Sequence, residues 1–227
     1  RDGELKNVEI CHIHTEGVAK YADIKFKDSF HVNSFFIGTN VRHTIAAGNG
    51  SYTPVFLSEV PLLFSKGILK LDAVFIQVSP PDIHGYCSLG VSVEATKAAV
   101  LNAKLVIAQI NKHMPRTFGD SSIHFSTIDY AVEHHEPIHQ SLVSEISETE
   151  NKVAGYVASL IDDKSCLQMG IGSIPNAVLA KLKNHKNLGI HTEMFSDGII
   201  DLVESGVING SHKGLYKDLI LSFFLVC

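Results

Sequence analysis

The sequence predicts an α/β fold with mostly parallel sheets, built from two similar units. Short apolar strands alternate with helical segments, an order that places helices on the faces of a parallel sheet. The chain also contains an internal repeat, since residues 6–10 and 14–17 are echoed by residues 186–190 and 191–193. Residues 34–37 and 222–225 form a second echo in the same order. Ordered internal matches of this kind indicate a duplicated structural unit.

In the first half, residues 7–13 and 31–37 are expected strands, and residues 52–66 are expected to hold a strand and then a helix. Residues 73–78 read Ala-Val-Phe-Ile-Gln-Val, an apolar run typical of a strand buried on both faces. This strand is expected to end at the Ser-Pro-Pro-Asp of residues 79–82, because proline lacks the N–H of a ladder donor. An alanine-rich helix over 94–102 and another buried strand over 105–110 follow.

The polar stretch 137–150 is the best candidate for a domain boundary. We therefore predict an N-terminal domain at residues 1–144 and the first part of a C-terminal domain at 145–227. Ser147 or Thr149 is available to cap a helix that ends near Ile161. Strands are then expected at 165–169 and 187–192, and helices at 175–183 and 199–205, the first with Pro175 near its first turn.

The two copies of the repeat differ in what precedes them. A glycine loop, Gly170-Ile171-Gly172, comes before the second copy, whereas the first copy has no room for one. This asymmetry predicts a chain that is cut at its N-terminus, and the apolar run ending at Cys227 predicts the same for the C-terminus. Such a fragment would expose the edges of unfinished sheets and is expected to aggregate or to be inactive alone.

Composition excludes several classes of protein. Hydrophobic residues make up 45% of the 227 residues, which is enough for a substantial core and excludes a disordered chain. The net charge of −5, with no cluster of Lys or Arg, argues against a nucleic-acid partner. No apolar run reaches the roughly 18 residues of a membrane span. The four scattered cysteines favour reduced thiols inside a cell, in the cytoplasm or, in a eukaryote, the mitochondrion.

Two features could carry chemistry. Gly170 and Gly172 lie between an expected strand and an expected helix, where backbone N–H groups can approach a phosphate; a tight turn without a ligand is the equal alternative. Glu193 lies just past the next strand, where α/β sheets gather ligands. Its carboxylate could act as base, metal ligand or nucleophile, or it could be a solvated or capping glutamate. Glu16, its counterpart in the repeat, is expected to be solvated.

The thirteen histidines indicate no metal site. Residues 134–139 read His-His-Glu-Pro-Ile-His, which lacks the spacing of a zinc protease and is expected to be a solvated surface run. His84 lies on a loop that could face the same crevice as the glycine loop; a loop histidine bonded to nearby backbone is the favoured alternative. No G-x-S-x-G elbow of a serine hydrolase is present.

Three longer motifs then stand out in order. They read Ser-Pro-Pro-Asp-Ile-His-Gly-Tyr at 79–86, Met-Gly-Ile-Gly-Ser-Ile-Pro-Asn-Ala at 169–177 and His-Thr-Glu-Met-Phe-Ser-Asp-Gly at 191–198. Together they resemble the acetyl-CoA hydrolase/transferase family over residues 5 to about 224, and most of all its 4-hydroxybutyrate and acetate CoA-transferase members. The resemblance implies two similar domains of the CoA-transferase type (NagB/RpiA-like).

The resemblance also implies an activity, the transfer of coenzyme A between a short-chain acyl-CoA and a carboxylic acid. It assigns Glu193 as the residue that becomes a glutamyl-CoA thioester, and the CoA-contacting loop to Gly170, Ile171, Gly172, Ser173 and Ile174. Acyl-CoA and a carboxylate would be the partners, with no metal, nucleic acid or membrane, and a homo-oligomer would be compatible with a crevice between paired domains. An acetyl-CoA hydrolase and an inactive fragment or binding protein of the same fold are the alternatives.

Overall fold

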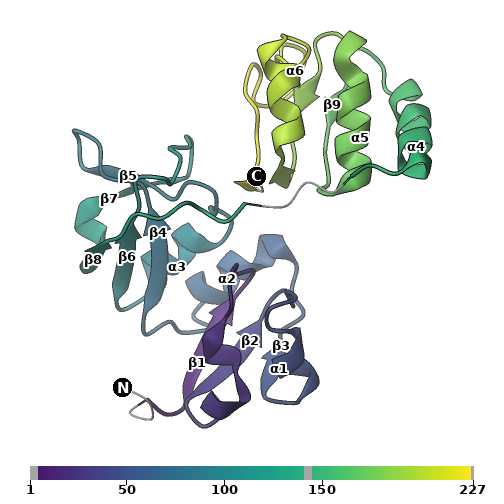
Figure 1. Cartoon of the computed structure of the whole chain (residues 1–227). Helices are drawn as coiled ribbons and strands as arrows, with labels where there is room; N and C mark the ends of the chain where they lie inside the picture. Colours follow the sequence, from purple (N-terminus) through teal and green to yellow (C-terminus); the bar gives the residue numbers. More distant parts are fainter. Residues whose placement is uncertain (1–4, 141–144, 226–227) are drawn as a thin grey trace. The chain divides into compact units, whose positions relative to one another are not determined.

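The computed structural model describes residues 5–140 and 145–225, and it divides into two compact units, one ending at Lys70 and the other beginning at Leu71 (Figure 1). This division falls inside the N-terminal domain predicted at residues 1–144. The predicted boundary at 144 lies outside the described residues, as do Arg1 and Cys227, so the domain assignment stays a prediction.

The first unit is built on a parallel three-stranded sheet of order β1-β2-β3. Its elements are β1 (Val8–His12), β2 (Phe30–Ser34), α1 (Arg42–Ala46), β3 (Gly50–Tyr52) and α2 (Val60–Ser65). Ala22, Val32 and Val41 form its small core. The strands expected at 7–13 and 31–37 are confirmed, with the second ending three residues earlier than predicted. The helix expected within 52–66 is α2, but the strand expected before it there is β3, which already ends at Tyr52.

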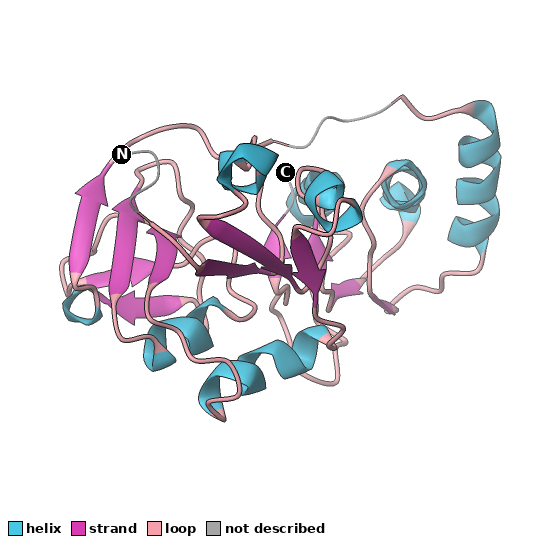
Figure 2. Ribbon diagram, turned by 90° about the horizontal axis from the view of Figure 1, so that it is seen from below, coloured by secondary structure: helices cyan, strands magenta, loops and turns pink. Residues whose placement is uncertain are grey.

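The second unit begins with another parallel sheet, of order β4-β6-β8, and a separate pair of antiparallel strands, β5 and β7. The elements are β4 (Val74–Val78), β5 (Tyr86–Ser88), α3 (Thr96–Asn102), β6 (Val106–Ile110), β7 (Ser122–His124) and β8 (Tyr130–Glu133). Figure 2 shows the strands and helices of the chain by type. The antiparallel pair was not expected, because its three-residue strands are too short to show an alternating pattern.

The expectation that residues 73–78 are buried on both faces is wrong. Ile76 and Val78 pack into the core of this sheet with Cys87 and Leu89, but Phe75 is 78% exposed. Side chains alternate between the two faces of a strand, so the core receives only every second residue of β4. A continuous apolar run therefore does not reveal which faces of the sheet are covered.

The rest of the second unit repeats the order helix, strand, helix, strand. Its elements are α4 (Glu148–Ser159), β9 (Cys166–Leu167), α5 (Ser173–Lys181), β10 (Gly189–Ile190), β11 (Met194–Phe195), α6 (Ile200–Glu204) and β12 (Phe224–Leu225). β9 pairs with β10 and β11 with β12, both in parallel. Single parallel bridges join Leu188 to Ile208 and His191 to Leu221. The predicted α/β alternation with mostly parallel pairing is confirmed.

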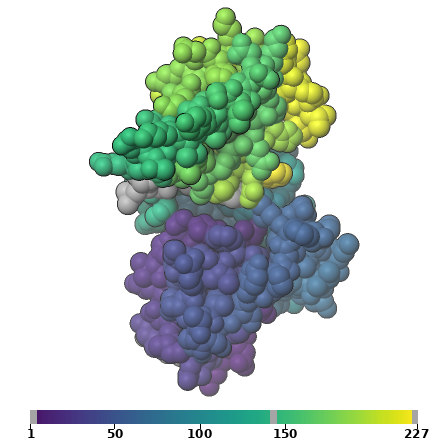
Figure 3. All heavy atoms as spheres, turned by 90° about the vertical axis from the view of Figure 1, so that its right-hand side faces the viewer, coloured from purple at the N-terminus to yellow at the C-terminus, as the bar shows by residue number. Residues whose placement is uncertain are grey.

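Helix α4 shows why these residues become helical. Ser147, one of the two caps that the sequence offers, caps its N-terminus in a reciprocal capping box with Glu150. Ala154 and Ala158 are buried, and their small side chains allow α4 to pack closely on α5. Figure 3 shows α4, in green, as a ridge on the surface. None of the helices within the described residues is long and apolar enough to cross a membrane.

The repeated segments have matching local geometry. Asn7 and Asn187 both adopt the left-handed conformation, with φ of 57° and 58°, directly before a paired segment. Asparagine tolerates this region better than most residues. Ser34 ends a strand that pairs in parallel with β1, and Phe224 begins one that pairs in parallel with β11. The sequence echo is thus matched by backbone conformation at its second residue and by parallel pairing at its second segment.

Candidate active site

Glu193 lies in a break between two paired segments. β10 ends at Ile190, β11 begins at Met194, and Glu193 occupies a bend between them with its side chain exposed. Its backbone carbonyl accepts hydrogen bonds from Phe223 N at 3.0 Å and from Ser222 Oγ at 3.2 Å. The carboxylate has no hydrogen-bond partner within the described residues. Its position is therefore set by the backbone, and it is open to an incoming reactant.

Thr192 connects Glu193 to the glycine loop. The Thr192 side chain is 2% exposed, and its Oγ1 accepts a hydrogen bond from Met169 N at 3.0 Å. The same hydroxyl reaches Met169 O at 2.9 Å and Met194 O at 3.1 Å, to either of which it can donate. Met169 directly precedes Gly170, and Thr192 directly precedes Glu193. The structure thus brings the two features that the sequence singled out to one place.

The glycine loop lies between β9 and α5, as the sequence predicts. Gly172 has φ of 114°, a conformation that side chains of L-residues rarely adopt. A Cβ built on Gly172 would meet no atom within 4 Å, and one built on Gly170 would meet only Pro175 Cγ, at 3.6 Å. Ile171 and Ile174 are 45% and 43% exposed. The loop therefore offers accessible backbone flanked by two apolar side chains.

The first turn of α5 already holds a carboxylate. Ser173 Oγ donates a hydrogen bond to Glu150 Oε1. Glu150 Oε2 accepts from Ser147 Oγ at 2.6 Å and from Ser147 N at 2.8 Å. The Ser147 side chain, then Ser173, lower the pKa of Glu150 to about 2. A negative group beside Ser173 disfavours a phosphate there. The electrostatics therefore do not favour anion binding at the N-terminus of α5.

Glu150 is expected to make the stability of the chain depend on pH. The folded-state pKa of about 2 lies below the ordinary 4.5, so the stabilisation is present above the ordinary pKa and is lost as pH falls from there toward 2. Urea unfolding of the wild type and Glu150→Gln should show a difference near neutral pH that shrinks over this window. Glu204→Gln, an exposed glutamate on α6, is the matched control. A difference that stays constant with pH would contradict the assignment.

The segment after Glu193 rests against α5. A Cβ on Gly198 would lie 3.0 Å from Leu179 Cδ1, and Ser196 Oγ is 3.4 Å from Asn176 Oδ1. Leu179 is fully buried in the core that α5 shares with β10 and α6. The Asp-Gly at the end of the motif is thus explained by packing, since only glycine avoids a tight contact with Leu179.

The loop at residues 79–86 is a rigid turn. Asp82 Oδ1 accepts hydrogen bonds from the backbone N–H groups of His84 and Tyr86, each at 2.9 Å. The Tyr86 N–H, above all, lowers the pKa of Asp82. Arg116 Nη2 donates to Pro80 O at 2.9 Å and to Tyr86 O at 3.1 Å. His84 is exposed and shares no hydrogen bond with the Glu193 segment, so its backbone bond to Asp82 is its observed role.

The histidine run and the cysteines form no candidate site within the described residues. His135 pairs with Glu133 at 3.0 Å and His134 with Glu136 at 3.6 Å. In the part of the chain that the structure describes, no group of three or more His, Cys, Asp or Glu residues could hold a metal ion. The described cysteines are free thiols: Cys11, Cys87 and Cys166.

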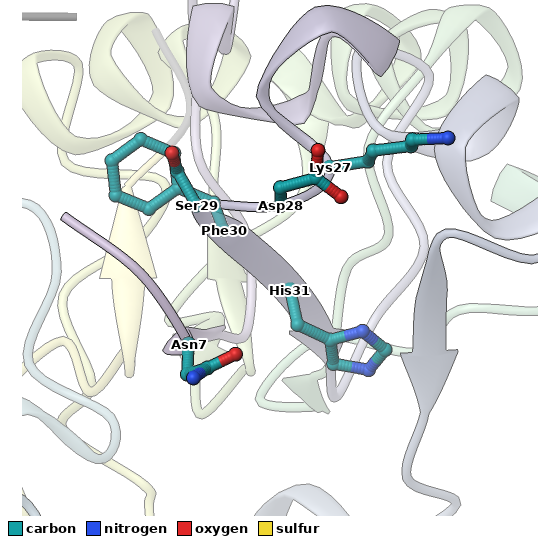
Figure 4. A pocket seen from close by; sticks show the side chains of 6 residues that line it. All are labelled: Asn7, Lys27, Asp28, Ser29, Phe30 and His31. Atoms are coloured by element: carbon teal, nitrogen blue, oxygen red, sulfur yellow. The ribbon is translucent and has the colours of Figure 1, made fainter. Parts of the chain in front are cut away.

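A cavity of about 410 Å³ in the first unit lies away from the predicted site residues. It is lined by Asn7, Lys27, Asp28, Ser29, Phe30 and His31 (Figure 4). These residues precede or begin β1 and β2, at the amino ends of the strands, whereas α/β sheets bind ligands at the carboxyl ends. None of the residues predicted to act in catalysis or CoA binding lines this cavity.

A family model described as the acetyl-CoA hydrolase/transferase N-terminal domain matches residues 1–142, more than half of the chain. The chain belongs to the acetyl-CoA hydrolase/transferase family. The resemblance carried by the three sequence motifs is therefore confirmed.

Two curated relatives of this family member and one solved structure similar to it are named CoA transferases. A succinyl-CoA:acetate/propanoyl-CoA:succinate CoA transferase of Fasciola hepatica is 47% identical over 223 residues, 98% of this chain and 46% of that protein. A 4-hydroxybutyrate coenzyme A transferase of Clostridium kluyveri is 47% identical over 219 residues, which are 96% of this chain and 51% of that protein. The crystal structure of a 4-hydroxybutyrate CoA-transferase from Porphyromonas gingivalis has 35% identity and a TM-score of 0.79, covering 97% of this chain and 59% of that one. The chain thus spans about half the length of these curated relatives.

Sequence reasoning missed three contacts close to the predicted site residues of this family member. Thr192 lies within the recognised motif, but its hydroxyl contact with Met169 depends on the fold. Glu150 was not singled out, because its bond to Ser173 joins residues that are distant in the sequence. Lys213, whose ammonium donates a hydrogen bond to Ile190 O, gave no signal, since a lone lysine in a polar loop is normally solvated.

Proposed function

We propose that the protein carrying this chain transfers coenzyme A between a short-chain acyl-CoA and a carboxylic acid, with Glu193 as the nucleophile. The observation that carries the proposal is the Thr192–Met169 contact, which holds an exposed carboxylate next to an accessible glycine loop. The activities for which the relatives are named support CoA transfer. Acetyl-, butyryl- and 4-hydroxybutyryl-CoA are the proposed donors.

The proposed chemistry needs only a carboxylate and CoA. A Glu193 oxygen attacks the thioester carbonyl of the acyl-CoA; the C–S bond breaks and CoA leaves as a thiolate, which gives an acyl-glutamyl anhydride. The thiolate then attacks the glutamyl carbonyl, the anhydride C–O bond breaks, and the free acid departs from a glutamyl-CoA thioester. A second carboxylate reverses these steps and leaves as the new acyl-CoA. The glutamyl-CoA thioester is about as activated as the acyl-CoA thioester that it replaces, so the chain of exchanges proceeds with little loss of free energy.

The proposed CoA contacts are Gly170, Ile171, Gly172, Ser173 and Ile174. Because Glu150 already places a negative charge beside Ser173, the uncharged pantetheine arm fits this loop better than a phosphate. Exposed backbone at the glycines suits the amides of pantetheine, and Ile171 and Ile174 suit its methyl and methylene groups. Binding of the remote parts of CoA can then supply energy for holding the thioester in line with Glu193.

An acyl-CoA hydrolase would use the same glutamate, with water in place of the second acid. Steady-state rates of acyl-CoA consumption with and without added acetate separate the two reactions in the gene product that carries this sequence. We expect consumption to require acetate and to yield acetyl-CoA in equal amount. Consumption at the same rate without acetate, with free CoA accumulating, would contradict transfer and support hydrolysis.

A further inference from the structure

Lys213 is a buried lysine that forms no ion pair in the part of the chain that the structure describes. Its side chain is 6% exposed, and the ammonium donates hydrogen bonds to Ile190 O and Leu219 O, each at 2.8 Å. Within the described residues no carboxylate pairs with it. Lysine is rarely buried without a counter-charge, because removing the ammonium from water is costly. A lysine held in this way by two neutral carbonyls therefore requires a specific role.

The strand β10 is built to accommodate the Lys213 side chain. A Cβ on Gly189 would lie 2.6 Å from Lys213 Cγ and 3.0 Å from Lys213 Cδ. Every other residue type at position 189 would displace the lysine stem, so the glycine and the lysine form a matched pair. The stem lies against the backbone of β10, and the ammonium reaches the carbonyl of the last residue of that strand.

The two carbonyls that Lys213 binds belong to the segment that leads to Glu193 and to the segment that pairs with it. Ile190 is three residues before Glu193, and its carbonyl also accepts from Leu221 N at 3.3 Å. Leu219 precedes Leu221, which pairs with His191 and accepts from Thr192 N at 2.9 Å. Lys213 thus ties together the two segments just before regular pairing breaks at Glu193.

We propose that Lys213 is a positioning residue for Glu193 in the CoA transfer proposed above. The Glu193 carboxylate has no hydrogen-bond partner of its own within the described residues, so its direction depends on how the backbone leaves β10. Lys213 fixes the backbone at the end of β10 from one side, because it holds Ile190 O and Leu219 O at a set distance. Thr192 fixes it from the other side through Met169. A shift of about 1 Å in the nucleophile can cost about 100-fold in rate.

The test is Lys213→Met, which keeps an unbranched stem over Gly189 and removes the ammonium. In the gene product that carries this sequence, we expect kcat to fall about 10- to 100-fold while the KM values for acyl-CoA and acetate change less than about threefold. The single-turnover rate of thioester formation on Glu193 should fall with kcat. Lys217→Met, an exposed lysine four residues later, is the matched control and should behave as the wild type.

The outcomes separate this proposal from the proposed function. If the wild type forms no Glu193 thioester, the proposed reaction is wrong and the positioning role falls with it. If the wild type forms the thioester and folded Lys213→Met forms it at the same rate, the positioning role alone is wrong. Should Lys213→Met not fold, Gly189→Ala gives the answer, because it keeps the ammonium but displaces its stem. A selective loss of kcat in that variant supports the proposal, and wild-type kcat overturns it.

Discussion

Glu193→Gln is expected to abolish CoA transfer. Glutamine keeps the size and hydrogen-bonding shape of the side chain, but an amide cannot attack a thioester or form the anhydride. Loss of a covalent nucleophile commonly lowers kcat by on the order of 10⁴-fold or more. The KM for acyl-CoA should change little, because the glycine loop and its link through Thr192 remain intact. Initial rates of acyl exchange at saturating acyl-CoA and acetate measure the effect.

The matched control for this variant is Glu204→Gln. Glu204 ends helix α6 in the same part of the chain, is exposed, and makes no ion pair within the described residues. Its replacement removes one carboxylate without touching the proposed site, so kcat should equal that of the wild type. Retention of more than about a tenth of the wild-type kcat in Glu193→Gln would contradict its role as nucleophile.

Thr192→Val is expected to destabilise the chain and to reduce activity together. Valine has nearly the shape of threonine, but it leaves Met169 N and Met169 O without the hydroxyl that they contact. Each buried polar group left unpaired costs about 1–3 kcal/mol, so we expect a loss of about 2–4 kcal/mol in the free energy of unfolding. Urea unfolding followed by circular dichroism measures this loss.

Thr192→Ser is the control that isolates the hydroxyl. Serine keeps the oxygen and removes one methyl group, for which we expect a cost of about 1 kcal/mol. It should retain most of the activity, whereas Thr192→Val should lose at least about tenfold in kcat, because the backbone before Glu193 is no longer tied to the glycine loop. Equal stability and activity of the two variants would show that the hydroxyl contact does not matter.

Local patterns in the sequence were sufficient for most helices and strands of the fold. The cap at Ser147, the glycine loop before α5 and the alternation around Glu193 follow from spacing and residue type. Boundaries shifted by a few residues where pairing partners end, as at Ser34. The burial of β4 could not be predicted, because Phe75 and Ile76 are equally apolar and only the packing distinguishes them.

The site was predictable only as far as its residues lie in contiguous motifs. Glu193 and the loop at 170–174 were found through the resemblance, whereas spacing alone left their roles open. The contacts that connect them join residues more than twenty positions apart, such as Met169 with Thr192 and Glu150 with Ser173. Pairings of this kind depend on the tertiary fold, and no local signal in the sequence encodes them.

The most direct test of the central claim is to trap the intermediate on Glu193. The gene product that carries this sequence is incubated with butyryl-CoA, reduced with borohydride, and examined by intact mass and peptide mapping, with Glu193→Gln in parallel. Borohydride converts the glutamyl thioester into an alcohol and releases CoA. The alcohol is a stable modification of one residue. We predict this alcohol at Glu193 in the wild type and nowhere in Glu193→Gln. Unmodified Glu193 together with intact butyryl-CoA would contradict the glutamyl-CoA route.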